Sequence, residues 1–286
     1  MSVVFLLVAL ASIAILSLIM LFLFHEGWPI FKNVALPEFV FGRFWYPTYE
    51  PPEFGIYPLV IASLAVTLGS ALLSIPLGVM TAIYLAEIAS PRLAEFLKPV
   101  VELLAALPSV VIGFFGMVLV APFLQSLLDI PTGLNLCNAC LMLAFMSIPT
   151  ICSLSEDAIH SVAPSLKEAS LALGATHLET IARVILPASL SGIATAVILG
   201  MSRAIGETMV VLMVAGGAAM VPESIFDPVR PLPASIAAEM AEAPVGSKHY
   251  HALFAIGIVL FFFTFAFNLI ADVVARRYKQ VGDATL

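Results

Sequence analysis

The chain has 286 residues, and its composition excludes an ordinary soluble domain. Hydrophobic residues make up 61% of the chain and charged residues 11%, whereas soluble domains contain about 45–50% and about 25% of these residue types. The formal net charge is −7 and the mean hydropathy is +1.08. These values predict an integral membrane protein surrounded by lipid, and we expect no nucleic-acid partner.

Six apolar segments are long enough to cross a membrane as helices, which takes about 20 residues. They cover residues 3–24, 58–85, 103–124, 136–152, 188–215 and 252–274. The fourth segment is the shortest, and Pro149 interrupts it. Because helices satisfy the backbone of such segments within lipid, the sequence predicts an all-α polytopic membrane helix bundle with a single transmembrane domain over residues 1–286.

Basic residues between the segments predict the orientation, because Lys and Arg in short loops favour the cytoplasmic side. Seven fall on one side and four on the other: Arg92, Lys98, Lys167, Arg183, Arg276, Arg277 and Lys279 against Lys32, Arg43, Arg230 and Lys248. This predicts both termini and the second and fourth loops in the cytoplasm. The alternative for the first segment is a cleaved signal peptide, but its apolar run is longer than a usual signal core.

The chain carries no signature of covalent catalysis. Three cysteines, Cys137, Cys140 and Cys152, lie in or beside the fourth segment. No second pair or nearby histidine completes a metal site, so small buried hydrophobes are the favoured interpretation. The sequence also contains no GxxxxGK[ST] phosphate loop. We therefore expect no catalytic residue, metal site or bound cofactor in this chain, and ATP chemistry would have to come from another chain.

Residues 163–187, between the fourth and fifth segments, predict two short cytoplasmic helices. Ser165-x-x-Glu168 and Thr176-x-x-Glu179 both fit the capping box that starts a helix, and Gly174 between them suits a left-handed helix end. Apolar residues recur on one face of each helix: Leu166, Ala169 and Leu173, then Leu178, Ile181, Ala182 and Ile185. The helices either lie against the membrane or the bundle, or dock into a groove on a soluble partner.

The same segment resembles the EAA signature of the permease subunits of ABC importers. The matching positions are Glu168, Ala169, Ser170, Gly174, Val184, Leu186 and Pro187, with Ser170 in place of an alanine and Val184 in place of an isoleucine. The resemblance implies a type I ABC importer permease fold in a bacterial inner membrane. It also implies that residues 163–187 form the segment that couples the permease to an ATPase.

Further stretches look like the PstC-type subunit of the phosphate importer. They are residues 107–116, 202–217, 226–240 and 251–273, and the similarity covers most of residues 56–277. This resemblance implies transport of inorganic phosphate and a PstA-type permease as the second subunit. It also implies a PstB-type ATPase dimer, which would hold ATP and Mg, and a PstS-type phosphate-binding protein outside.

The fifth segment combines a ridge of small residues with two charges. Ala188, Gly192, Ala196, Gly200, Ala204 and Thr208 recur at every fourth position, a pattern that lets another helix approach closely. Arg203 lies near the middle of the segment, where a lone arginine costs about 2.5–3.5 kcal/mol on insertion scales. Glu207 follows at i+4 and would share its face. The pair is therefore either a functional site or a structural ion pair.

Our hypothesis is that Arg203 offers paired donors to an oxyanion, a geometry that guanidinium suits. Glu207 would hold Arg203 when the path is empty and accept a hydrogen bond from protonated phosphate, which fully ionised sulfate cannot donate. Ser109 could offer its hydroxyl to the path, although a serine often bonds its own backbone instead. The acidic outer loops would repel a free anion, so we expect another component to deliver it.

Other functions stay open on the sequence alone. The same architecture could carry molybdate, sulfate or a phosphonate. An ion-coupled secondary transporter with Glu207 as proton carrier would show inverted repeats, and no convincing repeat is present. A membrane scaffold or sensor without flux would tolerate substitution of Arg203.

Overall fold

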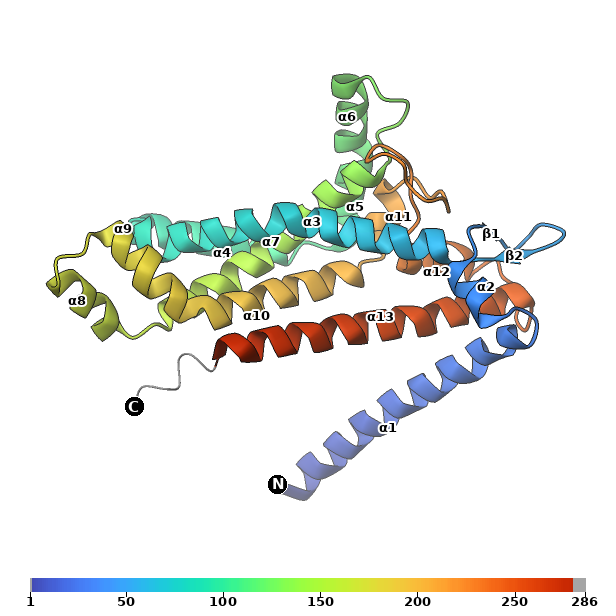
Figure 1. Ribbon diagram of the computed structural model, residues 1–286, viewed down its shortest axis with the longest axis horizontal. Coiled ribbons are helices and arrows are strands. Elements are labelled where there is room, and N and C mark those ends of the chain that lie inside the picture. The colour runs from blue at the N-terminus through green and yellow to red at the C-terminus, as the bar shows by residue number, and fades with distance from the viewer. Residues whose placement is uncertain (1, 280–286) are drawn as a thin grey trace.

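The computed structural model describes residues 2–279, and most of the described chain is helical. Within these residues, six helical stretches are long and apolar enough to cross a membrane, as predicted. Their principal helices are α1 (Ser2–Gly27), α3 (Tyr57–Ile83), α5 (Ser109–Phe115) with its continuation, α7 (Leu136–His160), α10 (Leu186–Ile205) and α13 (Lys248–Lys279). Apart from α1, which diverges from the bundle, the longest of these run nearly side by side (Figure 1).

Shorter elements extend or connect these helices. Some continue a spanning helix, namely η1 (Trp28–Lys32), η2 (Tyr84–Ile88), η3 (Gly116–Val120), α6 (Ala121–Leu128) and η4 (Ile181–Ile185). The connectors are α2 (Leu36–Phe41), α4 (Pro91–Ala105), α8 (Pro164–Ala172), α9 (His177–Thr180), α11 (Met209–Val214) and α12 (Leu232–Glu239). One antiparallel hairpin, β1 (Trp45–Tyr46) with β2 (Glu53–Phe54), adds to the predicted all-α fold and pairs Trp45 with Phe54.

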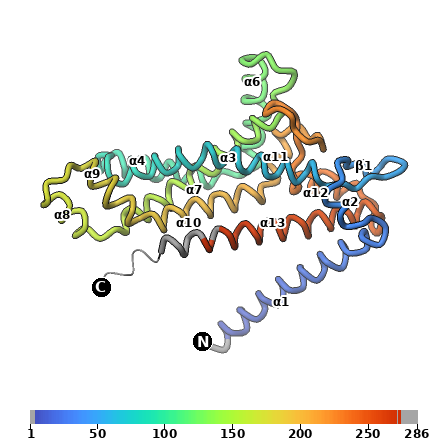
Figure 2. Tube along the Cα trace, in the orientation of Figure 1, coloured from blue at the N-terminus to red at the C-terminus, as the bar shows by residue number. Residues whose placement is uncertain are grey.

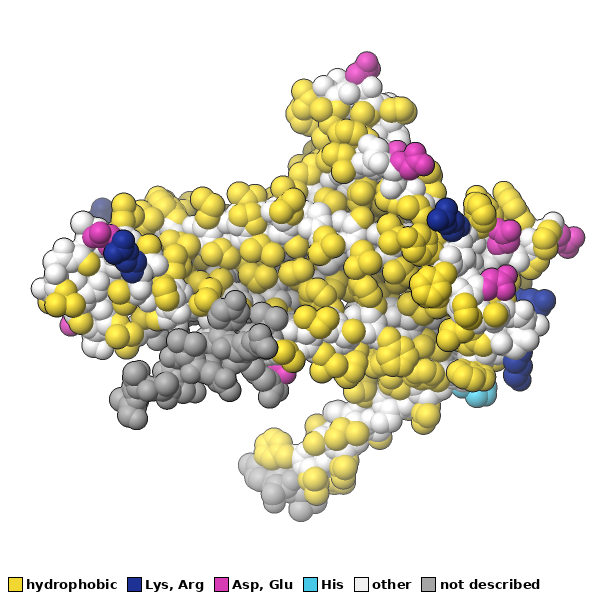
Figure 3. Space-filling view, in the orientation of Figure 1, with side chains coloured by type: hydrophobic (Ala, Val, Ile, Leu, Met, Phe, Trp, Pro, Cys, Tyr) yellow, Lys and Arg dark blue, Asp and Glu magenta, His cyan; other side chains and the backbone are white. Residues whose placement is uncertain are grey.

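The connecting elements gather at two opposite ends of the bundle. The hairpin, α2 and α12 lie at one end, called here the hairpin end, and α8 and α9 lie at the other (Figures 1 and 2). On the visible face, hydrophobic side chains cover the middle and charged side chains gather towards the ends (Figure 3). Both α1 and α13 meet the hairpin end, so the first described turn of α1 and the last described turn of α13 lie away from it. The side chains of Arg276, Arg277 and Lys279, counted in the charge analysis, lie outside the described part.

The predicted ridge of small residues packs against α7. A Cβ added to Gly200 would come 2.5 Å from Ile151 Cγ1, and one added to Gly192 would come 2.4 Å from Ala158 Cβ. Ala196, which lies between these two glycines, and Ala204, which follows Gly200 by one turn, are buried. The ridge is therefore confirmed over these four positions, because a larger side chain would push α10 away from α7. The prediction is wrong at the two ends of the ridge, because Ala188 is exposed and Thr208 lies outside the helix.

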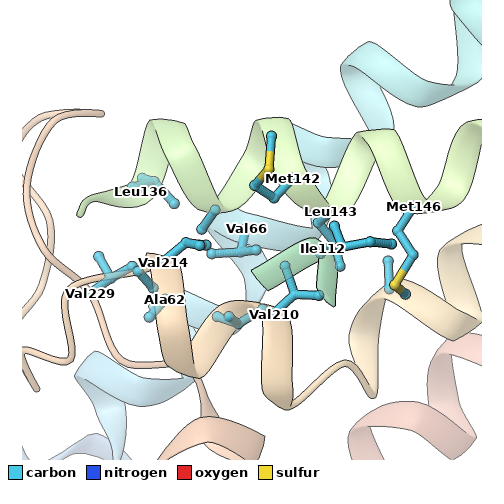
Figure 4. Packing of buried hydrophobic residues seen from close by; sticks show 14 residues of the cluster. Ala62, Val66, Ile112, Leu136, Met142, Leu143, Met146, Val210, Val214 and Val229 are labelled. Carbon is cyan, nitrogen blue, oxygen red and sulfur yellow. The ribbon is translucent and has the colours of Figure 1, made fainter. Parts of the chain in front are cut away.

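A hydrophobic cluster joins α3, α5, α7 and α11 near the hairpin end. Its larger members include Val66, Ile112, Leu143, Met146 and Val210. Figure 4 shows these side chains pointing towards one another from different helices. The cluster fixes α5, which begins at Ser109, and α11, which follows Glu207, against the bundle.

The third membrane segment starts later than predicted. Residues 103–105 end α4, and a turn leads to α5, whose N-cap is Pro108. A proline disfavours helical geometry in the residue before it, and this separates the two helices. Arg92 and Lys98 were predicted to lie in a loop, whereas both lie on α4. The predicted third span, residues 103–124, is replaced by Ser109–Leu128.

Candidate functional site

The fifth membrane segment is broken, and Glu207 lies in the break. Helix α10 ends at Ile205 and α11 begins at Met209. The Oε1 atom of Glu207 accepts hydrogen bonds from the backbone N–H groups of Met209 at 3.1 Å and Val210 at 3.2 Å. The prediction of one helix over residues 188–215 is therefore wrong. The carboxylate satisfies donors that a continuous helix would use internally, and Gly206 is a poor helix former.

Arg203 lies in the last turn of α10, on the exposed surface of the chain. A positive charge there interacts favourably with the carboxyl end of the helix dipole. Next to it, Ser202 Oγ donates a 2.6 Å hydrogen bond to Asn268 Oδ1 of α13. Within residues 2–279, no ion pair joins Arg203 to Glu207. The prediction that Glu207 lies one turn further along the same face and holds Arg203 is wrong, because Glu207 instead caps α11.

Ser109 lies at the level of this break. It is the first residue of α5 and is partly buried. A Cβ on Gly113, one turn later, would come 3.2 Å from Val210 Cα, and one on Gly116 would come 2.7 Å from Val214 Cγ1. Helices α5 and α11 therefore run in the same direction, which puts Ser109 level with Gly206–Thr208. Ser109 is therefore level with the break that contains Glu207, and among the described residues no hydrogen bond joins Ser109, Arg203 and Glu207.

The segment 163–187 forms the predicted helix, glycine turn and second helix. Gly174 has a left-handed φ of +87° between α8 and α9. The second capping box is confirmed: Thr176 N–H donates to Glu179 Oε2 at 2.9 Å, and Glu179 N–H donates to Thr176 Oγ1 at 3.3 Å. The first capping box is wrong, because α8 begins at Pro164 and Ser165 is already inside it. Proline suits this first position, since its fixed φ is helical and it lacks an N–H.

The EAA-type residues spread over α8, η4 and α10, with Gly174 in the turn after α8. Glu168, Ala169 and Ser170 lie on α8, and Leu186 and Pro187 begin α10. Ser170 Oγ and Thr180 Oγ1 are hydrogen-bonded at 3.0 Å, which closes α8 onto α9 across the Gly174 turn. Leu173 and Leu178 of this segment are uncovered, at 90% and 70% exposed. By contrast, Ile181 and Ile185 of the second predicted apolar face are buried against the bundle in a cluster with Leu85 and Cys152.

Two groups of charges hold the elements around this segment. Glu87 of η2 forms an ion pair with Lys167 of α8, and His177 Nε2 lies 3.8 Å from the same carboxylate. Lys98 of α4 lies 3.2 Å from both Glu156 and Asp157 of α7. Partial burial alone would lower the pKa of Lys98, but hydrogen bonds to Asp157 and Glu156 outweigh it and raise the pKa above its ordinary value.

A polar cluster at the hairpin end was not predicted from the sequence. The Glu239 carboxylate accepts hydrogen bonds from Trp45 Nε1 at 3.0 Å and from Arg230, and it lies 2.8 Å from His249 Nε2. Arg230 Nε also donates to the carbonyl of Gly217 at 2.6 Å. These residues line a cavity of about 570 Å³. Trp45 and Glu239 are 194 positions apart, so no spacing rule could have paired them.

Comparisons with known proteins agree with this architecture. The family described as binding-protein-dependent transport system inner membrane component matches residues 74–280. A probable ABC transporter permease protein YqgH of Bacillus subtilis is 40% identical over 273 residues, covering 95% of this chain and 88% of that protein. The phosphate transport system permease protein PstC of Mesorhizobium japonicum is 31% identical over 288 residues, covering 94% and 87%.

Solved structures show the same fold at lower identity. A bacterial alginate ABC transporter, in complex with an alginate pentasaccharide-bound periplasmic protein, aligns with a TM-score of 0.66 over 98% of this chain and 96% of the matched chain, at 16% identity. The MetNI methionine ABC transporter in an inward-facing conformation aligns with a TM-score of 0.61 over 76% and 93%, at 20% identity. The chain therefore belongs to the family of binding-protein-dependent transport system inner membrane components, and it is an ABC transporter permease with PstC-type relatives.

Proposed function

We propose that this chain is the PstC-type permease of an ATP-driven importer and forms a path for inorganic phosphate together with a second, PstA-type permease. The observation that carries the proposal is the segment 163–187, which presents the exposed apolar side chains of Leu173 and Leu178 at one end of a membrane bundle. Such a side suits insertion into a groove on a soluble partner. Relatives named PstC, at 31% identity over more than nine-tenths of the chain, support phosphate as the solute.

The soluble partner in this proposal is a PstB-type ATPase dimer, which holds ATP and Mg. Leu173 and Leu178 would enter its groove, with Glu168 and Ala169 beside them on the exposed surface of α8. On the opposite side, a PstS-type binding protein delivers phosphate past the acidic outer loops. Hydrolysis on the ATPase then moves the bundle, and this chain itself performs no covalent chemistry.

In the path, Arg203 is the residue that receives the anion. Its guanidinium is exposed on the isolated chain, and its planar donors match phosphate oxygens. Glu207 and Ser109 lie at the level of the helix break beside it. The carboxylate of Glu207 accepts a hydrogen bond from a protonated phosphate oxygen, which sulfate at neutral pH does not offer.

The test is uptake of labelled phosphate by cells that lack their own high-affinity system and receive this chain with its three proposed partners. Arg203→Gln is compared with Arg92→Gln, a matched control on the exposed surface of α4. We expect Arg203→Gln to lower uptake by about tenfold or more, equivalent to about 1.4 kcal/mol, at unchanged protein level, and Arg92→Gln to be neutral. Equal uptake by the Arg203 variant would overturn its role in the path.

A different oxyanion is the second candidate for the solute. The YqgH relative is named only as a probable permease, and the solved neighbours carry alginate or methionine. Competition of phosphate uptake with excess sulfate, molybdate or phosphonate separates these solutes. Uptake that persists without ATP would instead favour an ion-coupled transporter, and the absence of any uptake would favour a scaffold or sensor.

A further inference from the structure

One buried carboxylate contacts both helices of the coupling segment. Glu87 lies on η2, the continuation of spanning helix α3, and only 7% of its side chain is exposed. Lys167 of α8 donates to its Oε2 atom, and His177 of α9 lies 3.8 Å from the same oxygen. The carboxylate therefore joins the two helices that flank the Gly174 turn to one membrane-spanning helix.

The Lys167–Glu87 ion pair is a direct polar link from α8 to the stretch that continues α3. Helix α8 packs chiefly against α9 and η4, which belong to the same segment. Leu166 of α8 and Leu173 directly after it are 48% and 90% exposed, so these side chains do not anchor α8 to the bundle. Among the hydrogen bonds and ion pairs of residues 2–279, this ion pair joins α8 to the stretch that contains α3, and the Ser170–Thr180 hydrogen bond joins α8 to the stretch His177–Ile205 that contains α10.

From Glu87 the connection continues along α3 to the hairpin end. Leu85, two positions before Glu87, is buried in a cluster with Cys152 and Ile193 of the neighbouring helices. At the far end of α3, buried Ser63 Oγ accepts a 2.8 Å hydrogen bond from the backbone N–H of Leu232 in α12. A displacement of α8 that reaches Glu87 can therefore move a continuous helix that contacts the opposite end of the molecule.

We propose that Glu87 is a positioning residue that transmits movement of the coupling segment to α3 through its ion pair with Lys167. This inference rests on the proposed function, because it assumes that an ATPase moves α8. The buried position of Glu87 supports it: a charge removed from water needs its partner, so the carboxylate and the Lys167 ammonium move together rather than separate. A flexible surface pair would not impose such a constraint.

The experiment uses the complete complex with its ATPase and measures uptake per ATP hydrolysed. The variants are Glu87→Gln, Lys167→Met and the double variant, and the matched control is Lys98→Gln, which breaks a charge cluster between α4 and α7 instead. We expect about a tenfold loss of uptake per ATP in all three Glu87 and Lys167 variants, with the ATPase still bound. The control is expected to stay within about twofold of the wild type.

The double variant separates transmission from mere stability. If the pair only stabilises the fold, removing both charges leaves no unpaired buried charge, and coupling should return with the protein level. If the pair transmits movement, protein level returns but coupling does not. A double variant with wild-type uptake per ATP would overturn the proposal.

A second measurement needs no solute and so separates this inference from the choice of phosphate. We expect ATP with vanadate to change the trypsin cleavage pattern of the wild-type permease and to leave that of the double variant unchanged. Failure of phosphate uptake by the wild type would refute the solute alone. An identical ATP-dependent change in both proteins would refute the role of Glu87.

Discussion

Glu207 combines a charge with a capping role, and two substitutions separate them. Its carboxylate caps the backbone of α11. A glutamine keeps an acceptor oxygen at this position but loses the charge, whereas an alanine loses both. We expect Glu207→Gln to fold normally and to lose discrimination of phosphate against sulfate. We expect Glu207→Ala to lower the free energy of unfolding as well, by about 0.5–2 kcal/mol, as for other lost helix caps.

The measurements are phosphate uptake in excess sulfate and thermal unfolding in detergent. A Glu207→Gln protein with the rate and the sulfate rejection of the wild type would contradict a role for the charge. Equal thermal stability of the alanine and glutamine variants would contradict the capping role. Protein level in the membrane serves as the control for both substitutions.

At the scale of elements, the coupling segment offers a test of docking. Leu173 follows α8 and is 90% exposed, so a charge there should leave the fold of the isolated chain unchanged. We expect Leu173→Glu to weaken ATPase association by about tenfold or more, the effect of spoiling an apolar anchor. Val245→Glu is the control, since Val245 is 86% exposed at the hairpin end. Unchanged co-purification of the ATPase with the Leu173 variant would refute docking through this surface.

Hydropathy predicts the spanning elements well, because about 20 apolar residues have few other stable arrangements in lipid. Local motifs also succeed where all their parts are adjacent, as at Gly174 and at the Thr176–Glu179 capping box. The break at Gly206 was missed because the apolar run continues through it. The prediction of the first capping box was wrong because α8 begins at Pro164, one residue before Ser165.

Contacts between distant residues could not be predicted. Glu87 and Lys167 are 80 positions apart, and no local sequence pattern predicts that they contact each other. The candidate path residues Ser109, Arg203 and Glu207 were identified from their chemistry and resemblance. Their relative positions could not be predicted, because these depend on the packing of α5 against α11 and on a helix break within a continuous apolar run.

At the scale of the whole molecule, the two ends of the bundle differ in their surface and polar groups. One end holds the proposed coupling segment, residues 163–187, with exposed Leu173 and Leu178 and the Glu87–Lys167 ion pair. The other holds the hairpin, α12 and the Glu239 cluster around a cavity of about 570 Å³. Long helices such as α3 connect these ends, which is the arrangement required if ATP hydrolysis on one side of the membrane controls access from the other.

This division predicts which end faces the cytoplasm. The excess of basic residues lies on the side of the coupling segment, which favours the cytoplasm for that end and for both termini. We expect an impermeant maleimide to label Val245→Cys in intact inner-membrane spheroplasts and to label Leu173→Cys only after permeabilisation. The unmodified chain, whose Cys137, Cys140 and Cys152 lie within the fourth spanning helix, measures the background. Labelling of Leu173→Cys from outside would reverse the orientation and would exclude a cytoplasmic ATPase as the partner of α8.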